Sequence, residues 1–249
     1  MNVLPSQLFY FSPLFSEYSE VFHGTTTKQY GPVKRDISSV QKLCDAYKRK
    51  TTDLITAEQT HGNIVSEVSS QNGGVVAPSA DGLILRSENT DETKNLFLGI
   101  FTADCVPVFF YDPTNSLVGL CHGGWRGVYG KIVTQMVDMC RKNGSDPINL
   151  RVSLGPHIRA CSYSVPEERA EQFEKMYGKN TGVVSVFDTK YFLNLSEAIF
   201  LDLIQSGVKS DNIDHDSSPC TYCDTNAFYS YRRRSTEEYS EMISFIGFR

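Results

Sequence analysis

The sequence predicts a single α/β domain with a mixed sheet over residues 1–249. Segments rich in β-branched and aromatic residues alternate with segments whose apolar residues recur at helical spacing. No proline- or serine-rich linker, internal repeat or low-complexity tract divides the chain. The 249 residues, 40% of them hydrophobic, are enough to build a substantial core.

Individual elements follow from apolar spacing and from capping residues. Asp36 is placed to cap a helix, and Asn143-Gly144 to end another. Pro166 suits the first turn of a third helix. The expected helices cover residues 36–50, 128–142, 166–177 and 193–207, and the clearest strands cover 96–105, 106–112, 117–122 and 150–158.

Composition excludes several classes of protein. The formal charge of −5 and a pI near 5.6 argue against binding nucleic acid through overall charge. No apolar run approaches the roughly 20 residues of a membrane helix, and the start lacks the basic region of a signal peptide. Seven cysteines, an odd number, suit free thiols in a reducing compartment. We expect a cytoplasmic monomer that binds neither nucleic acid nor membrane.

Three residues at the ends of strand-like runs form the strongest candidate site. These are His61, Cys105 and His122, and a glycine directly follows each of the two histidines. Two imidazoles and a thiolate suit Zn²⁺ and leave a fourth position open, as in catalytic zinc sites. The spacing matches neither a zinc finger nor a helical pair of ligands, so a buried cysteine with two hydrogen-bonded histidines is the structural alternative.

The same sulfur has a second interpretation. A Cys105 thiolate could attack an acyl carbon, with a histidine such as His122 as the base. Asp104 would be the orienting carboxylate by its position in the sequence, although neighbours on a strand point to opposite faces. Metal ligand and nucleophile are therefore competing roles for Cys105.

Other motifs suggest binding groups. The glycine-rich loop after His122 precedes a predicted helix, where free backbone N–H groups and Arg126 could bind phosphate or carboxylate. Tyr231 and Arg232 combine an aromatic surface with a cation, which suits a flat base or simple packing. Cys220 and Cys223 form a lone CxxC pair, which suggests either a metal or redox site or an incidental structural role.

Several motifs in order resemble the YfiH-like family, also called laccase-domain or multicopper polyphenol oxidase-type proteins and associated with purine nucleoside phosphorylase activity. The matching segments are Gln59-Thr60-His61-Gly62, Ala80-Asp81-Gly82-Leu83, Thr102-Ala103-Asp104-Cys105-Val106-Pro107, His122-Gly123-Gly124-Trp125-Arg126-Gly127, Gly155-Pro156-His157-Ile158, Cys220-Thr221-Tyr222-Cys223 and Phe228-Tyr229-Ser230-Tyr231-Arg232-Arg233.

The resemblance implies a three-layer α/β/α fold with a mixed sheet, and zinc on His61, Cys105 and His122. It implies phosphorolysis of adenosine, inosine, guanosine and methylthioadenosine, together with adenosine deamination. The small-molecule partners are then a nucleoside and phosphate. Arg126 or Arg232 would position phosphate, Tyr231 would contact the nucleoside, and Asp104 would carry a proton.

Three rival functions stay open. One is a cysteine-type amide hydrolase with Cys105 as nucleophile, including a role in editing peptidoglycan precursors. A copper phenol oxidase is the second, but a multicopper site needs more histidines than the five in this chain. The third is a binding protein whose zinc is structural.

The chain departs from the family pattern at three places outside the predicted metal ligands. Lys28 stands where the family has arginine, Ser162 where it usually has a second cysteine, and Glu241 where arginine is frequent. If the missing arginines bind phosphate or close the site, these departures alter substrate choice or rate.

Overall fold

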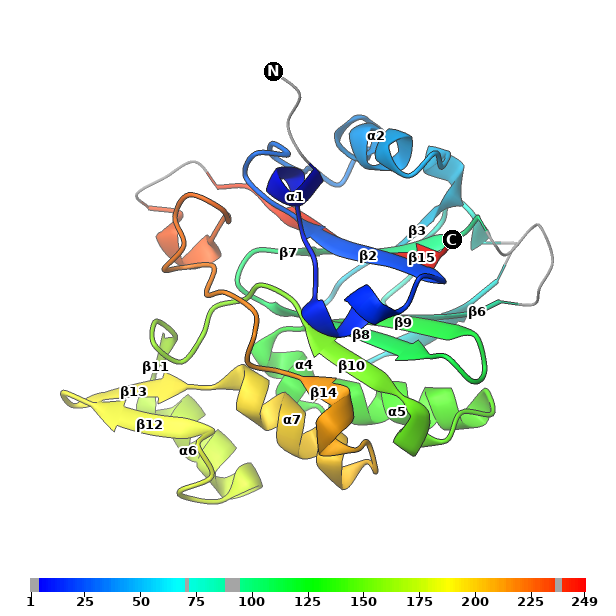
Figure 1. Cartoon of the computed structure of the whole chain (residues 1–249). Coiled ribbons are helices and arrows are strands. Elements are labelled where there is room, and N and C mark those ends of the chain that lie inside the picture. Colours follow the sequence, from blue (N-terminus) through cyan, green and yellow to red (C-terminus); the bar gives the residue numbers. More distant parts are fainter. Residues whose placement is uncertain (1–4, 70–71, 88–94, 236–238) are drawn as a thin grey trace.

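Two stacked mixed sheets form the centre of the structure (Figure 1). The computed structural model describes residues 5–69, 72–87, 95–235 and 239–249. Within those residues the first sheet has the strand order β1 (Phe9–Tyr10), β2 (Val21–Thr26), β15 (Met242–Phe248), β7 (Phe97–Thr102), β3 (Leu54–Ala57) and β5 (Val76–Ala77). Strands β7, β3 and β5 run parallel, and the other neighbours are antiparallel.

The second sheet has strands of both directions as well. Its order is β14 (Ile213–Asp214), β10 (Arg151–Leu154), β8 (Val106–Asp112), β9 (Leu117–Gly123), β6 (Gly82–Arg86) and β4 (Val65–Val68). A smaller antiparallel sheet of β11 (Ser164–Val165), β13 (Lys190–Leu193) and β12 (Val184–Phe187) lies at one end of the molecule.

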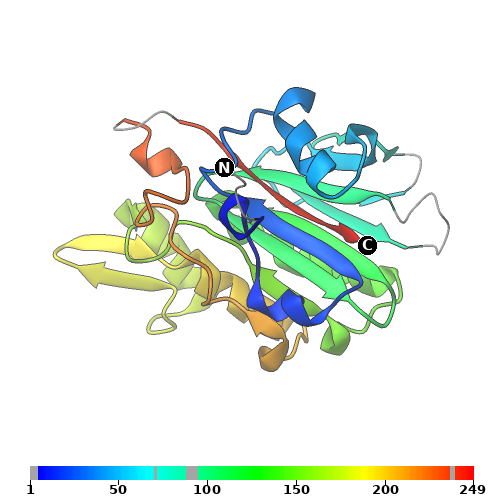
Figure 2. The same cartoon turned by 45° about the horizontal axis from the view of Figure 1, so that its top comes forward.

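Helices cover the outer faces of the two stacked sheets. Helix α2 (Ile37–Ala46) covers the first sheet, and α4 (Trp125–Tyr129), α5 (Ile132–Lys142) and α7 (Leu195–Gln205) cover the second (Figures 1 and 2). Helix α6 (Glu167–Tyr177) packs on the small sheet, and the short α1 (Pro5–Leu8) leads into β1. No helix in the described ranges has both the length and the apolar character needed to cross a membrane.

Alternating side chains show why the strands are apolar on both faces. In β8, Phe109 and Tyr111 point into the core between the two sheets, whereas Val108 and Phe110 point into the core beneath the helices. In β7, Leu98 likewise joins the core between the sheets. Strands buried on both faces read as continuous apolar runs, which is how residues 96–112 appear in the sequence.

The predicted mixed α/β class is confirmed, with one difference in layering. A single sheet between two helical layers was expected, but the strands divide between two sheets that pack on each other. The chain can do this because short links lead directly from a strand of one sheet to a strand of the other. The extent of a single domain over 1–249 stays a prediction.

Most helix predictions are confirmed, but the helix predicted over 36–50 ends at Ala46, and another prediction needs a larger correction. The Asp36 carboxylate accepts a hydrogen bond from the backbone N–H of Ser39 at 2.9 Å and so caps α2 as expected. The helix predicted over 128–142 is instead two helices. It breaks where Lys131 adopts a left-handed conformation, with φ of 65°, between α4 and α5.

Three of the links between the sheets leave from one edge. Residues 58–64 join β3 to β4, residues 78–81 join β5 to β6, and residues 103–105 join β7 to β8. Because β3, β5 and β7 are parallel, their carboxyl ends lie together at this edge. Ligand sites in α/β sheets form at such edges.

The core between the sheets predicts a stability difference between two phenylalanines. Phe109 is fully buried against Phe15 and His23, whereas the Phe187 side chain is 76% exposed. We expect Phe109→Ala to lower the free energy of unfolding by about 3–5 kcal/mol through lost packing and a residual cavity. Phe187→Ala should change it by less than about 0.5 kcal/mol. Urea denaturation measures both, and equal losses would contradict this description of the core.

Candidate metal centre and active site

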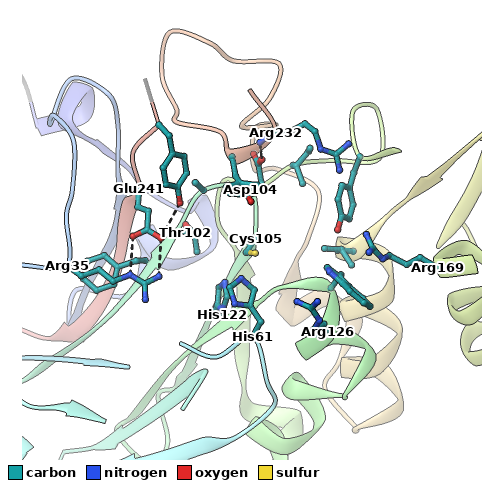
Figure 3. A pocket seen from close by; sticks show the side chains of 18 residues that line it. Arg35, His61, Thr102, Asp104, Cys105, His122, Arg126, Arg169, Arg232 and Glu241 are labelled. Atoms are coloured by element: carbon teal, nitrogen blue, oxygen red, sulfur yellow. Dashed lines mark hydrogen bonds and ion pairs between the residues drawn. The ribbon is translucent and has the colours of Figure 1, made fainter. Parts of the chain in front are cut away.

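The fold brings His61, Cys105 and His122 together. One ligand atom from each lies within 4.8 Å of the other two, and the two imidazole rings meet edge to face at 4.7 Å (Figure 3). His61 and Cys105 come from two of the links between the sheets, and His122 from the end of β9. His61 is exposed, Cys105 is half-buried and His122 is buried, so the cluster is open to solvent on the side of His61. These donors could hold a tetrahedral zinc ion with one position free.

Asp81, on the third link, holds the two histidines in place. Its buried carboxylate lies 2.8 Å from Nδ1 of His122 and accepts the backbone N–H of His61 at 3.0 Å. It also accepts the backbone N–H groups of Thr60 and Gly62 at 3.1 and 2.7 Å. Fixing Nδ1 of His122 directs Nε2 toward the cluster, as second carboxylates do around metal-bound histidines.

Two glycines after β9 allow close backbone packing at the cluster: Gly124, directly before α4, and Gly127, within α4. A Cβ on Gly124 would lie 3.1 Å from Cδ2 of His61 and 3.3 Å from Sγ of Cys105. A Cβ on Gly127 would lie 2.6 Å from the carbonyl oxygen of Gly62. The backbone at Gly124 therefore approaches the cluster, and the backbone at Gly127 approaches the link that carries His61, more closely than a side chain would allow.

Two of the non-glycine residues with a left-handed backbone lie at this site. His61 has φ of 62° and Asp104, next to Cys105, has φ of 87°. Non-glycine residues seldom adopt this left-handed region, and those that do are concentrated at functional sites. The strained conformations turn both links so that their side chains meet.

Contacts within the site shift the pKa values of Cys105, His122 and Asp81. Burial opposes ionisation of the Cys105 thiol, but His122 and His61 outweigh it and lower its pKa to about 6. Burial likewise favours neutral His122, yet Cys105 and Asp81 raise its pKa to about 9. Burial also opposes the Asp81 carboxylate, whose pKa is nevertheless lowered by its hydrogen bonds from His122 and Gly62. Without a metal, Cys105 and His122 therefore form a thiolate–imidazolium pair at neutral pH.

The cluster lies in a pocket of about 460 Å³, within the range of small-molecule sites. Four arginines and several aromatic side chains surround it (Figure 3). The lining residues are Arg35, His61, Phe101, Thr102, Ala103, Asp104, Cys105, His122, Trp125, Arg126, Ile158, Tyr163, Arg169, Leu195, Tyr231, Arg232, Tyr239 and Glu241.

The predicted binding residues Arg126, Tyr231 and Arg232 all line this pocket. The exposed Arg126 has its guanidinium 4.8 Å from the centre of the Trp125 ring. Arg232 is held more firmly, since one of its N–H groups donates to the backbone and side-chain oxygens of Ser164, both at 3.1 Å. Their contact with a substrate stays a prediction.

Asp104 also lines the pocket, and both oxygens of its carboxylate accept hydrogen bonds. It accepts hydrogen bonds from the hydroxyls of Thr221 at 2.6 Å and Ser230 at 3.0 Å. The backbone N–H of Arg232 donates to it at 2.7 Å. These contacts hold the 221–232 segment against the link that carries Cys105. Proton transfer by Asp104 stays a prediction.

The three departures from the family pattern fall in different places. Lys28 is outside the pocket lining, and its ammonium donates to the carbonyl of Thr225 at 2.9 Å. Glu241 is in the pocket and pairs with Arg35 through two hydrogen bonds of 3.1 and 3.0 Å. Ser162 lies beside the cysteine pair of the CxxC motif.

Sequence reasoning missed two residues of this site. Asp81 carried a signal, because it is an acidic residue immediately before an apolar strand. Arg169, on α6, carried none that distinguished it from the other charged residues of a surface helix. Its guanidinium lies 3.9 Å from the centre of the Trp125 ring, on the pocket wall. Among the residues that the structure describes, its buried Nε has no hydrogen-bond partner.

A family model described as multi-copper polyphenol oxidoreductase laccase matches residues 33–249. The chain belongs to this family. The purine nucleoside phosphorylase YlmD of Bacillus subtilis (strain 168) is 33% identical over 249 residues, which cover 92% of this chain and 88% of the relative. The YlmD protein of Geobacillus stearothermophilus, which has the same activity in its name, is 32% identical over 78% of this chain and 71% of its own.

Solved structures of similar proteins share the fold. The hypothetical protein YfiH of Bacillus licheniformis superposes with a TM-score of 0.85 at 28% identity, covering 99% of this chain and 98% of its own. YlmD of Geobacillus stearothermophilus gives 0.84 at 25% identity, covering 98% and 99%. The predicted family is thus confirmed.

The ionisation of the cluster predicts an unusually reactive thiol in metal-free protein. Because the pKa of Cys105 is lowered to about 6, its iodoacetamide alkylation should rise through about pH 6 and level off above it. Buried Cys44, whose pKa is raised to about 11, should stay unmodified. Peptide mass spectrometry after brief labelling at each pH follows each cysteine separately. A Cys105 rate that rises only near pH 8.5, as for a free thiol, would contradict the ion pair.

Proposed function

We propose that this protein is a zinc-dependent purine nucleoside phosphorylase that also deaminates adenosine. Its substrates would be adenosine, inosine, guanosine and methylthioadenosine. The observation that carries the proposal is the position of the His61–Cys105–His122 cluster inside an arginine-rich pocket of small-molecule size. The names of several relatives, purine nucleoside phosphorylase, point to the same reaction.

Arginines on the wall beside Trp125 suit the phosphate substrate. Arg126 and Arg169 both place their guanidinium groups against the Trp125 ring, so that both cations lie near the cluster. Guanidinium groups bind phosphate oxygens through paired charge-assisted hydrogen bonds. The unpartnered Nε of Arg169 makes it the stronger of the two candidates, and it extends the predicted set of Arg126 and Arg232.

Two tyrosines that line the pocket suit the nucleoside. The rings of Tyr231 and Tyr239 meet edge to face at 5.6 Å, and both line the pocket. A purine has a flat face that stacks on such rings, with about 1–3 kcal/mol per stacked base. We infer that the base lies against the tyrosines and the ribose toward the cluster.

In phosphorolysis a phosphate oxygen bonds to C1′ of the ribose while the bond from C1′ to the purine nitrogen breaks. The electron pair leaves with the purine, which takes up a proton, and ribose 1-phosphate is the second product. The arginines hold the attacking phosphate in line and balance its charge. A bound zinc ion would supply Lewis-acid stabilisation and an activated water for deamination.

A second candidate function draws on the alignment of Cys105, His122 and Asp81. A thiolate beside an imidazolium, which a buried carboxylate orients, is the arrangement of a cysteine hydrolase. The open His61 side then admits an amide substrate. This candidate keeps its activity after metal removal and loses it on alkylation of Cys105, whereas the phosphorylase loses it on metal removal.

Purified, zinc-loaded protein incubated with adenosine and phosphate should release adenine and ribose 1-phosphate. Parallel formation of inosine and ammonia would report deamination. Chromatography follows adenine and inosine, and omitting phosphate should abolish adenine release but leave deamination unchanged. If no adenine forms under conditions in which a known phosphorylase is active, the proposed function is wrong.

A pair of arginine variants locates the phosphate in the same assay. Arg169→Ala should raise the KM for phosphate about 10- to 100-fold, the effect of losing a charged hydrogen bond. The control is Arg86→Ala, which changes an exposed arginine at the end of β6 that does not line the pocket. Equal KM values in both variants would remove Arg169 from the phosphate site.

A further inference from the structure

A second group of potential ligands lies outside the cluster in the pocket. Sulfur atoms of Cys161, Cys220 and Cys223 are all within 4.8 Å of one another. The sequence presents only the CxxC pair, and the fold adds Cys161 from a segment about 60 residues earlier in the chain. None of these cysteines is needed for the proposed reaction.

The distances match a tetrahedral site for a soft metal ion. Four ligands at about 2.3 Å from zinc, in tetrahedral directions, lie roughly 3.8 Å from one another. The Sγ atoms of Cys161 and Cys223 are 3.6 Å apart, well beyond the roughly 2.05 Å of a disulfide.

Ser162 provides the fourth corner. Its hydroxyl oxygen lies 3.5 Å from Sγ of Cys161, 3.1 Å from that of Cys223 and 3.8 Å from that of Cys220. The distances from this oxygen to the three sulfurs and the distance between Cys161 and Cys223 thus lie between 3.1 and 3.8 Å, and Cys220 lies within 4.8 Å of the other two sulfurs. Thiolate ligands favour Zn²⁺ over the hard cations Mg²⁺ and Ca²⁺.

From this geometry we propose that Cys161, Cys220 and Cys223 bind a second zinc ion, with the Ser162 hydroxyl or a water molecule as the fourth ligand. The metal joins two segments that both reach the pocket. One segment continues to Tyr163 on the pocket wall, and the other carries Thr221, which donates to Asp104. Bound zinc therefore cross-links these two segments and fixes their relative position.

The exposure of the three cysteines determines how quickly the zinc ion can be removed. Cys161 and Cys223 are exposed, whereas Cys220 is buried. An ion held at the surface by three thiolates and one weak ligand is open to attack by chelators. We therefore expect zinc to leave this site faster than it leaves the pocket cluster, whose His122 is buried.

Zinc stoichiometry tests the site independently of the pocket cluster. Reduced protein is stripped with a chelator, reloaded with zinc, separated from free metal and analysed by elemental mass spectrometry. Wild type should hold about two zinc ions per chain, and both Cys105→Ala and the double variant Cys161→Ser/Cys223→Ser about one. If the pocket cluster binds no metal, wild type holds about one, and only the double variant loses it.

Cobalt loading identifies the ligands. Co²⁺ in Cys105→Ala protein should show the strong near-ultraviolet absorption of cobalt–thiolate bonds, and the Cys161→Ser/Cys223→Ser changes should abolish that absorption. Identical zinc content in wild type and the double variant, or no thiolate absorption in Cys105→Ala protein, would overturn the proposal.

If the double variant does not fold, a variant that adds a metal ligand still tests the proposal. Ser162→Cys completes a site of four thiolates and should slow zinc transfer to a colorimetric chelator at least about tenfold. Ser38→Cys, which adds an exposed thiol on α2, is the matched control and should leave the transfer rate unchanged. Equal transfer rates in both variants would contradict the assignment of Ser162 to the fourth corner.

Discussion

The hydrogen bonds of the buried Asp81 carboxylate are the interaction on which the site depends. One oxygen binds Nδ1 of His122 and the backbone of His61, and the other binds the backbone of Thr60 and Gly62. These contacts join the first link between the sheets to the end of β9. The parallel strands β3, β5 and β7 bring the three links to one edge, and Asp81 converts that proximity into a defined geometry.

The sequence carried enough information to predict the three candidate metal ligands, but not the residue that positions the two histidines or every residue that lines the pocket around them. His61, Cys105 and His122 were predictable because soft and borderline ligands at strand ends are rare and chemically distinctive. Asp81 depends on the register of β6 against β9, which pairs Gly82 with Cys121 and so places Asp81 beside His122. The acidic residue before this strand is visible in the sequence, but its contact with His122 is not, because contacts set by a register between distant strands have no local sequence pattern. Arg169 was missed for the same reason, because only the packing of α6 brings it to Trp125.

The fold was predictable in class and less so in layering. Apolar runs such as 96–112 show that both strand faces are buried, but helices and a second sheet cover a strand equally well. The break at Lys131 was also invisible, because the apolar positions of α5 continue the helical spacing. Capping residues with local partners, such as Asp36, were predictable because their contacts lie within a few residues.

The role of Asp81 is tested most directly by the zinc affinity of Asp81→Asn protein. An amide offers one accepting oxygen, so either His122 or the backbone of 60–62 loses its acceptor, and we predict about 10- to 100-fold weaker zinc binding at the pocket cluster. Competition with a chromophoric chelator measures this in protein that also carries Cys161→Ser and Cys223→Ser. Asp112→Asn in the same background is the control, because Asp112 is equally buried but accepts hydrogen bonds from Thr114 and Asn115 at the other end of β8 from Cys105. Weaker binding in Asp81→Asn alone supports the account, whereas unchanged affinity with the fold intact would contradict it.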